Sequence, residues 1–98
     1  MSLRHLVLLR FHEGTEPARV EALVAGLREL PGLIPGLDRY LVGPDLGLAE
    51  GTWDLGISAD FADEVAWAAY QAHPEHQRVI VELVRPITAE RAAVQFAT

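Results

Sequence analysis

The side chains best suited to acid/base chemistry in this sequence are histidines, and two of the four fall on patterns that face a protein interior. His5 alternates with Leu3 and Val7 in a strand-like segment, and His76 shares a helical stripe with Val79. Histidine changes protonation near neutral pH. The two imidazoles could converge to build a ligand site in an apolar interior, or each could be a buried histidine with one hydrogen-bond partner.

Tyr70 is the third candidate, because it lies six residues before His76 on the same predicted helical region. A phenol near an imidazole could orient a substrate carbonyl or stabilise its enolate. Trp67 lies one helical turn before Tyr70, and packing in the core or at an interface is the simpler explanation for it. The sequence therefore offers His76, His5 and Tyr70 as candidate catalytic residues.

The remaining polar candidates favour structural roles. His73 and His76 are three residues apart, but Pro74 separates them and no carboxylate is forced into range, so we expect no metal site. His73 is expected to fix the turn into the following helix, and His12 to be solvated. Asp54 and Asp60 are expected to be solvated or interface carboxylates.

Missing residue types narrow the chemistry further. The chain has no cysteine, and all eight of its basic residues are arginine. Thiol nucleophiles, thiolate metal sites and lysine Schiff bases are thereby excluded. Serine occurs only at Ser2 and Ser58, neither within a nucleophile-elbow pattern. Histidine and carboxylate chemistry remains.

Length and charge limit the class of protein. Ninety-eight residues that are 50% hydrophobic correspond to one domain, residues 1–98. The formal net charge of -6 disfavours nucleic acid and anionic membranes as partners. No apolar run is long enough to span a bilayer, and no secretory signal is evident, so we expect a cytoplasmic location.

The elements that must position the histidines follow an α+β order. Period-2 patterns predict strands at 3–11 and 53–61, with shorter strands at 38–42 and 91–97. An amphipathic helix capped by Thr15 is predicted to end at the PGLIPGL segment, residues 31–37; a helical pair follows at 62–72 and from Pro74 until Pro86. This is the split βαβ arrangement of a ferredoxin-like βαββαβ subunit, a four-stranded antiparallel sheet with helices on one face.

Leu6 and Leu8 would lie on the other face of that sheet and be exposed to solvent. Monomeric proteins rarely expose such a face. A second copy packed sheet to sheet would cover it, although Asp54, Ser58 and Asp60 would make the interface mixed and wet. The sequence therefore predicts a homodimer.

The segments RHLVLLRF, LPGLIPG, GTWDLGISADF and, above all, YQAHPEHQ at 70–77 resemble the stress-responsive dimeric α/β barrel family from end to end. The resemblance implies a ferredoxin-like subunit that pairs into a dimeric α/β barrel. It also implies similarity to olivetolic acid cyclase, a family member that closes a linear polyketide without metal or organic cofactor. By its motif, the base of that reaction corresponds to His76, with His5 and Tyr70 as further pocket residues.

Two departures separate this chain from the cyclase. Leu55 stands where the cyclase has a histidine, and Gly26-Leu27 lies where it has a tyrosine. The resemblance thus implies the fold more strongly than the cyclase reaction. The leading interpretation is a homodimer that binds an apolar small molecule with a polar head and uses His76 for cofactor-independent catalysis. The alternative is a non-catalytic stress-related or scaffolding dimer with a closed core; a monooxygenase or haem-handling role would rest on analogy of fold alone.

Overall fold

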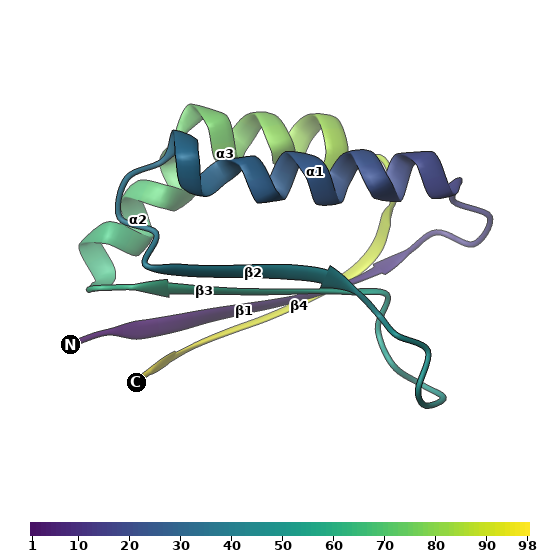
Figure 1. The fold of residues 1–98 in the computed structure, drawn as a ribbon, viewed down its shortest axis with the longest axis horizontal. Helices are drawn as coiled ribbons and strands as arrows, with labels where there is room; N and C mark the ends of the chain where they lie inside the picture. Colours follow the sequence, from purple (N-terminus) through teal and green to yellow (C-terminus); the bar gives the residue numbers. More distant parts are fainter.

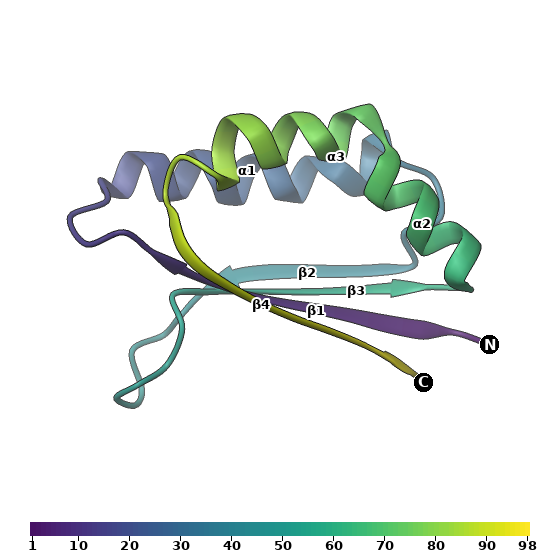
Figure 2. The same cartoon turned by 180° about the vertical axis from the view of Figure 1, so that it is seen from behind.

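The computed structural model describes residues 1–98 as one antiparallel sheet covered on one face by helices (Figures 1 and 2). The elements are β1 (Leu3–Phe11), α1 (Pro17–Leu33), β2 (Arg39–Pro44), β3 (Leu55–Phe61), α2 (Glu64–Ala72), α3 (Pro74–Val79), a π-helical turn (Ile80–Val84) and β4 (Thr88–Ala97). The predicted ferredoxin-like subunit is confirmed. No helix is long and apolar enough to cross a bilayer.

The sheet has the strand order β2-β3-β1-β4, so β1 lies in its interior with antiparallel partners on both sides. Directly paired residues share a face. His5 pairs with Ala59 on β3 and Gln95 on β4, and Leu9 pairs with Arg91. His5 and Leu9 are buried, so this row of side chains points toward the helices. Gln95 and Arg91 therefore face the helical layer as well.

The first helix differs from its prediction at both ends. Thr15 does not cap it: Glu16 occupies the cap position without a side-chain hydrogen bond, and the Thr15 hydroxyl donates to the His12 carbonyl at 2.6 Å. The helix also continues through Pro31 to Leu33. Proline removes one backbone donor, but only in the last turn, where burial of Leu30 and Ile34 stabilises the extra residues.

The last helical region contains a π turn that its sequence did not indicate. The Arg85 N–H donates to the Ile80 carbonyl, a spacing of five residues that accommodates one extra residue in the turn. With this extra residue in the turn, Val84 is buried, whereas Leu83, which continues the helical spacing of His76 and Val79, is only half-buried. Gly26 of α1 lies against this turn, and a Cβ atom there would come within 2.5 Å of Leu83 Cδ1. Any side chain at residue 26 would therefore require Leu83 to move.

Strand boundaries also shift. β3 begins at Leu55 rather than at residue 53, and Trp53 instead lies under the Arg10 guanidinium, 4.3 Å from the ring centroid. β4 begins at Thr88 rather than at residue 91, because its pairing with β1 starts opposite Phe11. The second helical segment starts at Glu64, after an Asp63 side-chain cap on the Ala66 N–H.

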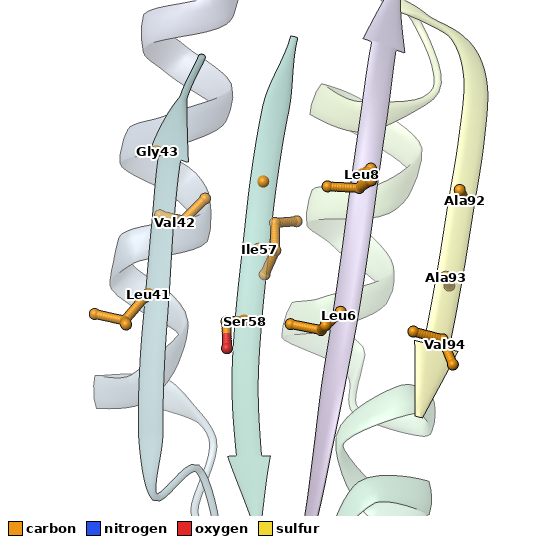
Figure 3. A pocket seen from close by; sticks show the side chains of 11 residues that line it. Leu6, Leu8, Leu41, Val42, Gly43, Ile57, Ser58, Ala92, Ala93 and Val94 are labelled. Atoms are coloured by element: carbon orange, nitrogen blue, oxygen red, sulfur yellow. The ribbon is translucent and has the colours of Figure 1, made fainter. Parts of the chain in front are cut away.

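The face of the sheet opposite the helices is uncovered, and its centre is apolar (Figure 3). Leu6 and Leu8 of β1 lie on it between Leu41 of β2 and Val94 of β4, and together these side chains line a shallow groove. Leu8 is 41% exposed and Val94 is 53% exposed. We refer to Leu6, Leu8, Leu41 and Val94 as the open face.

Candidate functional site

A cavity of about 290 Å³ lies between the sheet and the last two helical segments, and the three predicted site residues all line it. His5 comes from β1, Tyr70 from α2 and His76 from α3. Val7, Leu9, Leu27, Ile57, Ile80 and Val84 form the apolar part of the wall. The cavity is at the small end of the range for organic ligands. The structure thus brings together side chains that lie up to seventy-one positions apart in the sequence.

His76 is held by the backbone that precedes its helix. Its Nδ1 lies 3.2 Å from the Gln71 carbonyl oxygen. A carbonyl can only accept a hydrogen bond, so Nδ1 carries the proton in the neutral ring and Nε2 keeps its lone pair. Burial lowers the pKa of His76, the Gln71 contact opposes this, and the nearby Arg91 and His73 lower it further. His76 is therefore a neutral imidazole at pH 7, with a basic Nε2.

His5 has the opposite arrangement of protons. The Gln95 side-chain amide donates to Nδ1 of His5 at 2.7 Å, so the neutral ring carries its proton on Nε2. Burial lowers the pKa of His5 to about 4, and the positive charges of Arg91 and of protonated His76 lower it in the same direction. His5 is therefore a neutral hydrogen-bond donor through Nε2.

Tyr70 packs against His76, with 4.2 Å between the two ring centroids. Phe61 lies on another side of the phenol at 5.2 Å, and the residue is almost fully buried. Burial raises the pKa of the Tyr70 hydroxyl, so it is protonated at neutral pH. The Tyr40 hydroxyl is close enough to affect this pKa, but it is buried without a partner at hydrogen-bonding geometry. Tyr70 therefore offers a neutral hydroxyl beside His76.

Arg91 and Gln95 of β4 are site residues that the sequence did not single out. Gln95 sets the tautomer of His5, and the charge of Arg91 acts on His5, Tyr70 and His76. Arg91 and Arg85 both line the cavity. The signal that could have located them is the register of β4 against β1, which places Gln95 opposite His5.

Comparison with known proteins identifies the family. Residues 3–98 match the Stress responsive A/B Barrel Domain. The chain belongs to this family. It is 30% identical over 77 residues to the Stress-response A/B barrel domain-containing protein HS1 of Arabidopsis thaliana, a match that covers 76% of this chain and 70% of that protein.

Solved structures agree with this membership in the stress-responsive A/B barrel family. A dimeric ferredoxin-like protein from Thermobifida fusca superposes with a TM-score of 0.93 at 41% identity, covering 100% of this chain and 92% of that one. A hydroxynitrile lyase from Passiflora edulis has a TM-score of 0.84 at 15% identity, covering 97% and 91%. The second likeness is one of fold alone.

The other polar residues considered from the sequence have structural contacts. His73 Nδ1 accepts the Glu75 N–H at 3.1 Å and so fixes the turn into α3, as predicted. Asp60 pairs with Arg4 through two hydrogen bonds of 2.7 and 3.0 Å, and Asp54 accepts the Phe11 N–H at 2.7 Å. His12 is exposed. None of these side chains lines the cavity.

Trp67 packs edge-on to His5, with the ring centroids 6.2 Å apart, which agrees with the packing role expected for it. Leu55, which replaces a histidine of the cyclase, is buried in the core and does not line the cavity. Leu55 therefore contributes to the hydrophobic core and not to the cavity wall.

Proposed function

We propose that this family member is a homodimer that binds a small organic molecule in the cavity of each subunit and promotes proton transfer there, with His76 as general base. The observation that carries the proposal is that one cavity is bordered by His5, Tyr70 and His76. Apolar walls with a few convergent polar groups are the usual construction of ligand sites.

The protonation states favour a division of roles. The free lone pair on His76 Nε2 can accept a proton from a carbon next to a carbonyl group, and the lowered pKa keeps that nitrogen unprotonated at pH 7. The negative charge that develops on the carbonyl oxygen then needs donors. The cavity wall offers two such hydrogen-bond donors, His5 Nε2–H and the Tyr70 hydroxyl. The substrate class is an enolisable carbonyl compound with an apolar tail.

The dimer is inferred from the open face. Its leucine and valine side chains would be exposed to solvent in a monomer, whereas a second copy packed sheet to sheet would bury them. The Thermobifida fusca relative, 41% identical over the whole chain, is dimeric. Because the open face and the cavity lie on opposite sides of the sheet, dimerisation leaves the cavity free.

The rival function is a non-catalytic dimer with a stress-related or scaffolding role. It would need no space beside the histidines, so a cavity of about 290 Å³ favours the ligand-binding proposal over it. A hydroxynitrile lyase has the same fold, which supports the idea that this architecture can house an enzyme.

The test is catalysis of carbon deprotonation. Alkyl phenyl ketones in D₂O are incubated with the protein, and loss of their α-proton signals is followed by NMR. We expect wild type to accelerate the exchange and His76→Ala to reduce this acceleration by about 10²-fold or more, the usual range for a general base. Circular dichroism and dimer mass should change little in the variant.

His12→Ala is the matched control, because it removes an imidazole that is exposed and outside the cavity. Its exchange rate should equal that of wild type. If wild type neither binds nor exchanges any ketone while His76→Ala unfolds the protein, His76 is a core residue whose hydrogen bond the fold requires, and the non-catalytic dimer is correct.

A further inference from the structure

Two exposed arginines at the cavity wall form no ion pair with an acidic side chain. Arg85 and Arg91 both line it, and its thirteen lining residues include no aspartate or glutamate. The ion pairs of the chain involve Arg4, Arg10 and Arg78 instead. The chain has 14 acidic and 8 basic residues, so its net charge is negative, whereas the only charged side chains of the cavity wall are two arginines.

The position of Arg91 follows from the sheet register. It pairs with Leu9, whose side chain is buried under the helices, so Arg91 extends from the same face of β4 toward the cavity. Its charge acts on all three candidate residues and favours a lower pKa at His5, His76 and Tyr70 alike. Arg85 comes from the end of the π turn, on the opposite layer. The two cations therefore reach the cavity from the sheet and from the helices.

We propose that the cavity selects small organic anions, with Arg91 and Arg85 binding a carboxylate or a similar planar anionic head while the apolar wall holds the tail. The proposal rests on the ligand-binding function proposed above and adds that the preferred ligands are anions. Guanidinium groups match carboxylates in geometry and bind them through paired, charge-assisted hydrogen bonds. A cation next to the cavity would also stabilise an enolate formed there.

The experiment compares 4-alkylbenzoates with 4-alkylbenzyl alcohols of the same chain lengths, which share an apolar tail and differ in the charge of the head. Calorimetry measures the dissociation constants at pH 7.5, where the benzoates are ionised. We expect wild type to bind the acids about tenfold more tightly than the alcohols. Arg91→Gln should weaken acid binding by about fivefold to tenfold and leave alcohol binding unchanged, and the Arg85→Gln, Arg91→Gln double variant should abolish the preference.

Arg19→Gln is the matched control, because Arg19 is an exposed arginine of α1 that is neither ion-paired nor part of the cavity wall. It removes the same charge from the chain and should leave both series unchanged. Amide chemical shifts show where the acid or alcohol binds. Binding in the cavity should change the amide shifts of Val84 and Arg91, whereas binding to the open face should change those of Leu6 and Leu8.

Three results overturn the proposal in distinguishable ways. Equal affinity of wild type for acids and alcohols, with shifts at the cavity, would remove the anion preference and leave the ligand-binding function standing. Equal loss of acid binding in Arg19→Gln and Arg91→Gln would attribute the preference to net charge alone. Absence of binding in both series at millimolar concentration, or shifts confined to the open face, would remove both proposals.

Discussion

The lowered pKa of His5 makes the stability of the protein depend on pH in a window where carboxylates contribute little. His5 is 3% exposed, and its pKa falls from the ordinary 6.5 to about 4 on folding. Below pH 6.5 the unfolded chain binds a proton at this ring that the folded chain does not, so acid favours unfolding. This contribution is absent above pH 6.5, grows as the pH falls, and is complete near pH 4.

The magnitude follows from the two pKa values. Each unit of difference corresponds to about 1.4 kcal/mol, so the full effect is roughly 3 kcal/mol per subunit and the part between pH 7 and pH 5 is about 2 kcal/mol. His76 adds a loss of the same sign, since burial lowers its pKa too. Asp60 has a lowered pKa because of its ion pair with Arg4, so its contribution is lost only at more acidic pH.

Urea unfolding at pH 7 and pH 5, at one protein concentration, measures the effect. His5→Asn is the informative variant, because its side-chain oxygen can still accept the Gln95 hydrogen bond but cannot titrate. We expect the free energy of unfolding of this variant to fall by about 2 kcal/mol less than that of wild type over this interval. His12→Asn, at an exposed position, should behave as wild type. Equal pH dependence in wild type and His5→Asn would refute the reasoning, since His5 would then be protonated as readily in the folded chain as in the unfolded one.

Two further predictions concern the dimer and metals. Leu8→Asp should convert the protein to a monomer, because it places a charge at the centre of the open face. Light scattering at micromolar concentration measures this, and an unchanged dimer mass would show that the interface lies elsewhere. Addition of a chelator should leave the thermal midpoint unchanged, since the His73 Nδ1 already accepts a backbone N–H; a fall of several degrees would show that His73 and His76 hold a metal.

The fold could be predicted because its main signals are local. The alternation of residues in β1 and β3 gives the face on which each side chain lies, and this alternation is sufficient to place His5 inward and Leu8 outward. The π turn could not be predicted, because no local motif marks the Ile80 to Arg85 hydrogen bond and the close approach of Leu83 to Gly26 joins segments far apart in the sequence.

The sequence was sufficient to predict that His5, His76 and Tyr70 belong to the candidate site, but not which residues determine their protonation. Gln95 and Arg91 lie at the far end of the chain from His5, and only the pairing of β4 with β1 makes them neighbours. Tyr40 affects the pKa of Tyr70 across the interior in the same non-local way. The sequence therefore located the rings but could not assign their protons.

The arrangement of protons on His5 and His76 supports the proposed ligand site over two purely structural histidines. A buried histidine needs one partner, and His5 and His76 each have one. Those partners differ in kind: an amide that donates to His5 and a carbonyl that accepts from His76 leave one ring with a free N–H and the other with a free lone pair. Both free nitrogens belong to rings that line one cavity, and Arg91 discourages protonation of either ring. A neutral donor and a neutral base at the wall of one cavity are the two groups that removal of a proton next to a carbonyl requires, and this supports the proposed function.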